Sequence, residues 1–141
     1  MLGRDEIAAL IPHKGTMCLL ERVIEWDQRH AVLTTTTHRA LDNPLRLAGR
    51  LRAIHLCEYG AQAMAVHCCL LGSTGSAKKG FLVSLRDVRF HIDYVGDLAG
   101  ELRVTAECLL DVGMSWQYAF EVRHDDRLLA QGRAAAIAPA S

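Results

Sequence analysis

A helix that is apolar on every side is the feature that most constrains the fold of this chain. Residues 55–71 read HLCEYGAQAMAVHCCLL, and Glu58 is the one charged residue among them. Apolar and small residues recur at helical spacing, which predicts a helix over roughly residues 51–71. A helix that is hydrophobic all round has to be covered on all sides. Burying an unpaired carboxylate is costly, so Glu58 is expected to hold a proton or a partner.

The segments around this helix predict one antiparallel sheet. A short helix is expected over residues 3–10. Strands are expected where apolar residues alternate with polar ones or β-branched residues cluster: 17–26, 31–38, 81–94, 100–110, 114–124 and 128–138. One long helix with about six antiparallel strands is an α+β arrangement. The sequence has no internal repeat, and we expect a single domain over residues 1–141. Because one curved sheet covers only part of the helix, we also expect a homodimer.

Composition excludes several classes of protein. Sixteen basic and sixteen acidic residues give a formal net charge of zero, and a nucleic-acid binder would show a basic stripe. The sequence has neither an export signal nor an apolar stretch free of charge that could span a membrane. Five cysteines, an odd number with no C-x-x-C spacing, argue against a disulfide scaffold and favour the reducing cytoplasm.

Three segments together resemble bacterial 3-hydroxyacyl-ACP dehydratases. LIPHKGTMCLLERVIEWD (residues 10–27) resembles the opening of those enzymes, CEYGAQAMAV (57–66) their central helix, and LRDVRFHIDYVGD (85–97) a strand and turn. The central-helix segment is most similar to the branch associated with aryl polyene pigment clusters. The resemblance implies a hotdog fold, in which an antiparallel sheet of about six strands wraps around one central helix. It implies dehydration of a 3-hydroxyacyl thioester on acyl carrier protein to a trans-2-enoyl product, with no cofactor.

The resemblance places Glu58 at the position of the catalytic acid. An apolar setting would keep such a carboxyl protonated and able to protonate the departing hydroxyl. The alternative is a structural carboxylate that caps the backbone or pairs with an arginine across a dimer. The family's usual catalytic histidine lies in a GHFPG segment about fourteen residues before the acid, where this chain has Pro44.

Three histidines remain as candidates for the base: His13, His38 and His55. We prefer His13, because the PHKG segment lies close to the substrate tunnel in the dehydratases that this chain resembles; Pro12 is expected to line the same tunnel. His55 lies one helical turn before Glu58 and shares its face, so it is a candidate to contact the acid or the substrate. His38 is expected to be exposed at the end of a strand.

Other residues are assigned supporting roles. Gln62, one turn after Glu58, is expected to orient the acid or contact the acyl chain, and Gly49 lies where a backbone N–H near the helix N-terminus could bind the thioester oxygen. Arg46, Arg50 and Arg52 form a local basic cluster that could meet the phosphopantetheine phosphate of a carrier protein, or be a solvated face. No set of residues has the spacing of a metal site.

Two other functions stay open. A hotdog acyl thioesterase would use the helix carboxylate to activate water and would need no histidine at position 13. A non-catalytic subunit would bind acyl-ACP, or a second and active dehydratase, without turning over substrate.

Overall fold

The computed structural model describes residues 2–11, 15–72, 81–112 and 115–137. Within these residues the α-helices are α1 (Arg4–Leu10) and α2 (Leu56–Leu71), and short 3₁₀ turns lie at Gly15–Met17, Thr37–Arg39 and Ala53–His55. The six strands are β1 (Arg22–Trp26), β2 (His30–Thr35), β3 (Phe81–Phe90), β4 (Leu102–Asp111), β5 (Ser115–His124) and β6 (Arg127–Ile137).

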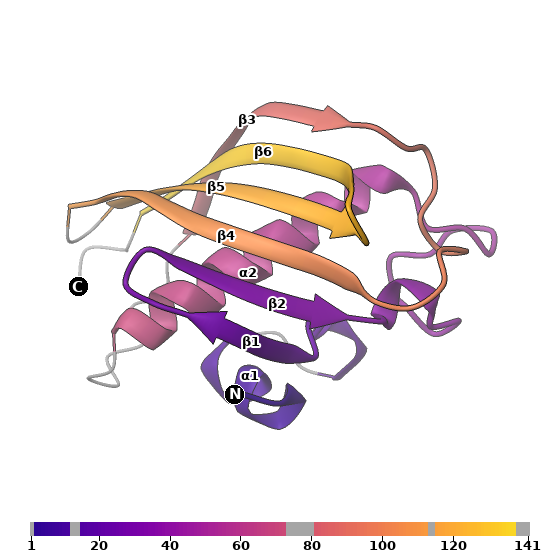
Figure 1. The fold of residues 1–141 in the computed structure, drawn as a ribbon, viewed down its shortest axis with the longest axis horizontal. Coiled ribbons are helices and arrows are strands. Elements are labelled where there is room, and N and C mark those ends of the chain that lie inside the picture. The colour runs from indigo at the N-terminus through magenta and orange to yellow at the C-terminus, as the bar shows by residue number, and fades with distance from the viewer. Residues whose placement is uncertain (1, 12–14, 73–80, 113–114, 138–141) are drawn as a thin grey trace.

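The six strands form one antiparallel sheet in the order β1-β2-β4-β5-β6-β3. In β5, buried and half-buried residues alternate along the strand, as expected when one face of a sheet packs on the core. The sheet curves around α2, which crosses its inner face, and α1 lies beside β1 (Figure 1). The predicted α+β arrangement, with about six strands around one long helix, is therefore confirmed.

Close contact between α2 and the sheet depends on two glycines. A Cβ atom at Gly60 of α2 would lie 2.4 Å from Cδ1 of Phe120 on β5, and one at Gly132 of β6 would lie 2.9 Å from the other side of the same ring. Real carbon atoms do not approach that closely. The Phe120 ring is therefore held between a helix and a strand that both lack a side chain where the ring lies.

The first strand is shorter than the sequence predicts, and the prediction for residues 17–21 is wrong. The side-chain amide of Gln62 donates to the Met17 carbonyl (2.7 Å) and accepts from the Leu19 N–H (3.0 Å). The hydroxyl groups of Thr35 and Thr37 donate to the Leu19 carbonyl. Side chains thus take up the backbone groups that a strand ladder would have used.

The second strand also ends early, at Thr35, and a 3₁₀ turn follows at Thr37–Arg39. None of the helices described is long and apolar enough to cross a membrane.

Candidate active site

Glu58 lies in the first turn of α2 and its side chain is half-buried. Residues one and two turns further along the same side of the helix, Ala61 and Ala65, are half-buried too. Other residues of α2, such as Tyr59 and Ala63, are completely buried. Glu58 therefore belongs to the stripe of α2 that the described part of the chain covers least.

Gln62 connects Glu58 to the segment that precedes β1. It is 1 % exposed, and its Nε2 lies 3.5 Å from Oε1 of Glu58 and 2.7 Å from the Met17 carbonyl. Its oxygen accepts from the Leu19 N–H. The amide is thus fixed at both ends, and its remaining hydrogen points to the carboxylate. The two roles expected for Gln62, orienting the acid or contacting the acyl chain, stay predictions.

His55 and Gly49 lie on the chain leading into α2. His55 ends the 3₁₀ turn directly before the helix, one turn ahead of Glu58, and is half-buried. Gly49 has a φ of 76° and follows Ala48 with a φ of 52°. Ala48 and Gly49 form a tight turn, which is closed by two backbone hydrogen bonds between Leu47 and Arg50, one in each direction. Gly49 is exposed in this turn, and its expected contact with a thioester oxygen stays a prediction.

His13 and Pro12 lie outside the described residues. The nearest described positions are Ile11, which is buried, and Gly15, whose carbonyl accepts a hydrogen bond from Arg4. The roles of base for His13 and of tunnel residue for Pro12 stay predictions.

The expectation that His38 is exposed is wrong. The side chain is completely buried, and its Nε2 donates to the Leu98 carbonyl at 2.9 Å. The other ring nitrogen, Nδ1, is buried and has no hydrogen-bond partner in the described part of the chain. Burial lowers the pKa of His38 below the usual value. His38 is therefore a buried imidazole that binds the loop at Leu98, sixty positions later in the chain, and its role is structural.

Arg46 is part of the loop structure. Its guanidinium donates to the carbonyl groups of His38, Ala40, Gly49 and Gly96, so it joins the loop before α2 to the loop after β3.

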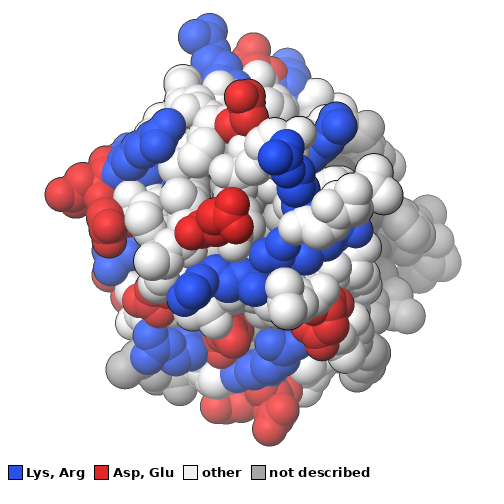
Figure 2. All heavy atoms as spheres, turned by 90° about the vertical axis from the view of Figure 1, so that its right-hand side faces the viewer, with Lys and Arg blue, Asp and Glu red and all other residues white. Residues whose placement is uncertain are grey.

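Arg50 and Arg52 are exposed, and Arg50 lies over the Tyr94 ring at 4.6 Å. They belong to the loops at the right-hand end of Figure 1, and basic side chains form a band across that end of the molecule (Figure 2). Leu41 and Leu47 of the same loop region are 90 % and 73 % exposed. This end thus offers exposed cations and apolar side chains together.

Two buried polar clusters were not predicted from the sequence. Tyr59 of α2 bonds to Thr37 and Asn43 through its hydroxyl, which fixes the 37–43 segment on the helix. Further along, the Tyr118 hydroxyl lies 2.6 Å from Nδ1 of His67, and Nε2 of His67 donates to the Asp27 carbonyl at 2.8 Å. Because a carbonyl only accepts, Nε2 carries the hydrogen, and in the neutral ring Nδ1 accepts from Tyr118. The feature of the sequence that could have indicated these clusters is the presence of a histidine and tyrosines at core positions.

Among the described residues, no group of three or more His, Cys, Asp or Glu side chains is arranged to hold a metal ion.

Solved structures with the same fold match the chain over most of its length. A chain of the dehydratase heterocomplex ApeI:P from Xenorhabdus doucetiae matches with a TM-score of 0.85 and 24 % identity, covering 100 % of this chain and 93 % of that one. A hypothetical thioesterase with coenzyme A from Streptococcus pneumoniae matches with a TM-score of 0.64 and 14 % identity, covering 85 % and 86 %. The E. coli PaaI protein from the phenylacetic acid degradation operon matches with a TM-score of 0.63 and 16 % identity, covering 95 % and 88 %. The chain has the hotdog fold.

No curated protein sequence matches the chain. A protein-family model described as ApeP-like, ApeP dehydratase, matches residues 5–141. Since this match spans almost the whole sequence, the protein belongs to the ApeP-like dehydratase family.

Proposed function

We propose that this protein removes water from a 3-hydroxyacyl thioester carried on acyl carrier protein and gives a trans-2-enoyl thioester, in aryl polyene biosynthesis in the cytoplasm. Membership of a dehydratase family supports the reaction class. The observation that carries the assignment of residues is the half-buried carboxylate of Glu58, which the buried Gln62 amide contacts on the less covered stripe of α2.

In this mechanism Glu58 is the acid and protonates the departing β-hydroxyl group. An imidazole takes the α-proton, and we assign this step to His13. Support comes from Gln62, because the same amide that contacts Glu58 also holds Met17, four residues after His13, against α2. Elimination of water requires a base that takes the α-proton and an acid that protonates the departing β-hydroxyl group. No step needs a cofactor.

The assembly that we propose is a homodimer in which a second copy covers the half-buried stripe of α2. In the described sheet β3 is an outer strand and pairs on one side with β6. A ten-residue outer strand exposes unpaired backbone groups that tend to pair with another chain. Pairing through β3 would continue the sheet and bring a second protomer to the helix that the sheet wraps.

The exposed Arg50 and Arg52, with Leu41 and Leu47 beside them, fit the acidic surface and phosphopantetheine phosphate of a carrier protein. Arg46 is left out of this role, since its guanidinium is occupied by backbone carbonyls.

The test is turnover of 3-hydroxyacyl carrier proteins of several chain lengths, aliphatic and aromatic. Enoyl absorbance reports dehydration and free thiol reports hydrolysis. Glu58→Gln and His13→Ala are each expected to abolish enoyl formation and leave the oligomeric state unchanged. The control variant Glu101→Gln removes an exposed carboxylate and should retain enoyl formation. Full enoyl formation in both site variants would refute the assignment, and thiol release in its place would identify a thioesterase.

A second candidate is a subunit that completes its site with another dehydratase chain. Two observations favour it: Pro44 stands where the family has its usual histidine, and the most similar of the structures described above comes from a dehydratase heterocomplex. Activity that is absent from the purified chain, appears on mixing with a histidine-bearing hotdog subunit and is lost again with Glu58→Gln would establish it.

A further inference from the structure

Buried hydrogen bonds connect the loop before α2 to Glu58 without interruption. Four polar side chains make these bonds, and each is at most 8 % exposed: Asn43, Tyr59, Thr37 and Gln62. They lie on two separate parts of the sequence and are joined through the backbone of a third part, at Leu19. We call these four side chains the buried network.

The direction of each hydrogen bond follows from what the groups can donate. Nδ2 of Asn43 donates to Oη of Tyr59 at 3.1 Å, and Oδ1 of the same amide accepts from the Leu45 N–H. The hydrogen of the Tyr59 hydroxyl is thus available for Oγ1 of Thr37, 2.9 Å away. Thr37 in turn donates to the Leu19 carbonyl at 2.6 Å. Burial raises the pKa of Tyr59, so its hydroxyl keeps the hydrogen that it donates.

Leu19 joins this part of the network to the acid. Its carbonyl is held by Thr37, and its N–H donates to Oε1 of Gln62 at 3.0 Å. Nε2 of Gln62 donates to the Met17 carbonyl at 2.7 Å and lies 3.5 Å from Oε1 of Glu58. The backbone thus locates both ends of the Gln62 amide, and a displacement of Leu19 would move the group that contacts the carboxylate.

A buried polar network is costly unless every member is satisfied, and apolar side chains would pack the same volume without that requirement. The hydrogen bonds of the network fix residues 17–19 and 37–43 against the part of α2 that carries Glu58. Asn43 directly precedes Pro44, which stands where the dehydratases that this chain resembles have their usual histidine. This segment therefore contributes a residue whose hydrogen bonds lead to the acid.

We propose that the first three members of the buried network, Asn43, Tyr59 and Thr37, are positioning residues for the acid of the proposed dehydration. They act on Glu58 through the Gln62 amide, so this inference rests on the proposed function. Misplacing a catalytic group by about 1 Å can cost about a hundredfold in rate. The effect belongs to kcat, because the network holds the acid and not the acyl chain.

The test compares the steady-state kinetics of hydroxyl-deletion variants in the assay that measures enoyl absorbance. It uses the purified chain or, where activity needs it, the mixture with a histidine-bearing hotdog subunit. Tyr59→Phe and Thr37→Val are each expected to lower kcat by about ten- to a hundredfold and to change KM by less than about twofold. Thr37→Ser keeps the hydroxyl group and should keep most of the kcat.

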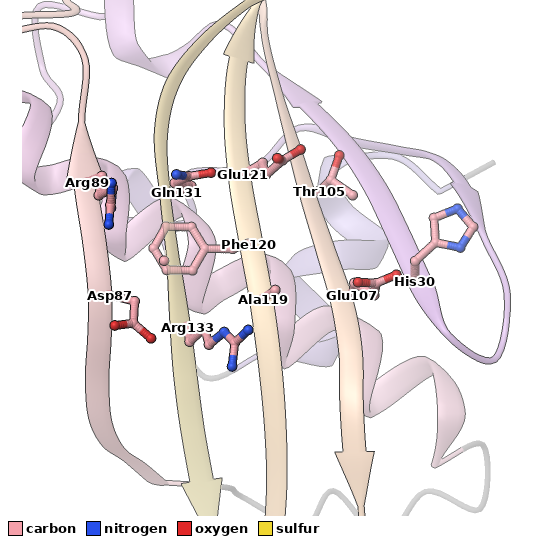
Figure 3. A pocket seen from close by; sticks show the side chains of 11 residues that line it. His30, Asp87, Arg89, Thr105, Glu107, Ala119, Phe120, Glu121, Gln131 and Arg133 are labelled. Atoms are coloured by element: carbon pink, nitrogen blue, oxygen red, sulfur yellow. The ribbon is translucent and has the colours of Figure 1, made fainter.

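Two matched variants remove hydroxyl groups that lie outside the buried network. Tyr118→Phe changes a second buried tyrosine, whose hydroxyl contacts His67 toward the other end of α2. It should lower stability as Tyr59→Phe does and leave kcat unchanged. Thr105→Val changes a side chain of the open hollow on the face of the sheet opposite α2 (Figure 3) and should also leave kcat unchanged.

Hydrogen exchange of the Leu19 amide reports on the network without turnover, because this N–H donates to Gln62. Tyr59→Phe should speed the exchange at least about tenfold, whereas Tyr118→Phe should not change it. Circular dichroism shows whether each variant is folded.

Full kcat in Tyr59→Phe and Thr37→Val, with no enoyl formation in Glu58→Gln, would overturn this inference and leave the proposed function standing. An equal loss of kcat in Tyr118→Phe, or unchanged exchange of the Leu19 amide in Tyr59→Phe, would overturn it as well. Full turnover in Glu58→Gln, or no turnover in either preparation, would refute the proposed function and this inference with it.

Discussion

Replacing Gly60 by alanine tests how α2 is held against the sheet. Alanine is the better helix former by about 1 kcal/mol, so propensity alone predicts a more stable protein. The structure predicts the opposite. The new Cβ would lie 2.4, 2.5 and 2.9 Å from three carbons of the Phe120 ring, whereas contact between carbon atoms is most favourable at about 3.5–4.0 Å.

The Phe120 ring has no free space on its other side. A Cβ at Gly132 would be 2.9 Å from Cε2 and Cζ of this ring, so the ring already touches the β6 backbone. Either the ring leaves its rotamer or α2 moves away from the sheet. Overpacking of this kind costs about 1–3 kcal/mol or more. After subtracting the propensity gain, we expect Gly60→Ala to lower the free energy of unfolding by about 1–2 kcal/mol.

The assay is urea unfolding at a fixed protein concentration, because association changes the apparent stability. The reverse change at the neighbouring half-buried position, Ala61→Gly, measures the propensity alone and should cost about 1 kcal/mol. Adding Phe120→Leu to Gly60→Ala should recover part of the loss, which would show that the ring and the new methyl group are coupled. A Gly60→Ala protein that is more stable than the original would refute the packing argument.

The remaining predictions concern the buried polar groups. Gln62→Glu should lower the free energy of unfolding by about 1–3 kcal/mol in urea titrations, because it removes the donor to a backbone carbonyl and sets a second carboxylate beside Glu58. Tyr118→Phe should cost about 1–3 kcal/mol in the same titrations, because it leaves the buried Nδ1 of His67 without a donor. Burial lowers the pKa of both His67 and His38, so stability should fall as the pH drops below about 6.5, where the unfolded chain takes up protons that the fold resists. The slope should be shallower in His38→Gln.

Matched variants separate these effects from general damage. Tyr94→Phe removes the hydroxyl of a partly exposed tyrosine, and a loss equal to that of Tyr118→Phe would contradict the role given to the Tyr118 hydroxyl.

His30 should act in the opposite direction to the buried histidines, because hydrogen bonds to Glu25 and Asp27 raise its pKa. Its contribution is complete below about pH 6.5 and is lost as the pH rises through the raised pKa. His30→Gln should therefore remove a gain in stability that the original chain shows as the pH falls toward about 6.5, and an unchanged profile above that pH would contradict the sign.

Local patterns predicted the elements whose contacts are regular. The alternation of apolar and polar residues located β4, β5 and β6 to within a few residues, because one face of each strand packs on the core over its whole length. The apolar stretch before Gly72 located α2 for the same reason. These strands and the helix are the parts whose hydrogen bonds lie within the element or run to a neighbouring strand.

Contacts between distant parts of the chain decided the rest. Residues 17–21 have the composition of a strand, yet Gln62, more than forty positions later, takes two of their backbone groups. His38 looked like an exposed strand end because its partner, the Leu98 carbonyl, lies sixty positions away. Arg46 looked like a free surface cation, but four carbonyls surround its guanidinium. No local pattern contains such distant partners. Neighbouring residues therefore could not predict the hydrogen bonds between residues 17–21 and Gln62 or the burial of His38.

The position of Glu58 explains why an apolar helix can carry a carboxylate. One side of α2 packs on the sheet through Gly60 and Ala63, and a second side holds the segment after Gly15 through Gln62. The stripe that begins at Glu58 is the side left half-covered by the described chain. A carboxylate there avoids the full cost of burial in the isolated protomer and meets it only when another surface closes over the stripe. The proposed chemistry would then begin with assembly, because the same contact that covers the helix would dry the acid and complete the site. On this reasoning, a variant that remains a folded monomer should bind acyl carrier protein and form no enoyl product, although it retains Glu58.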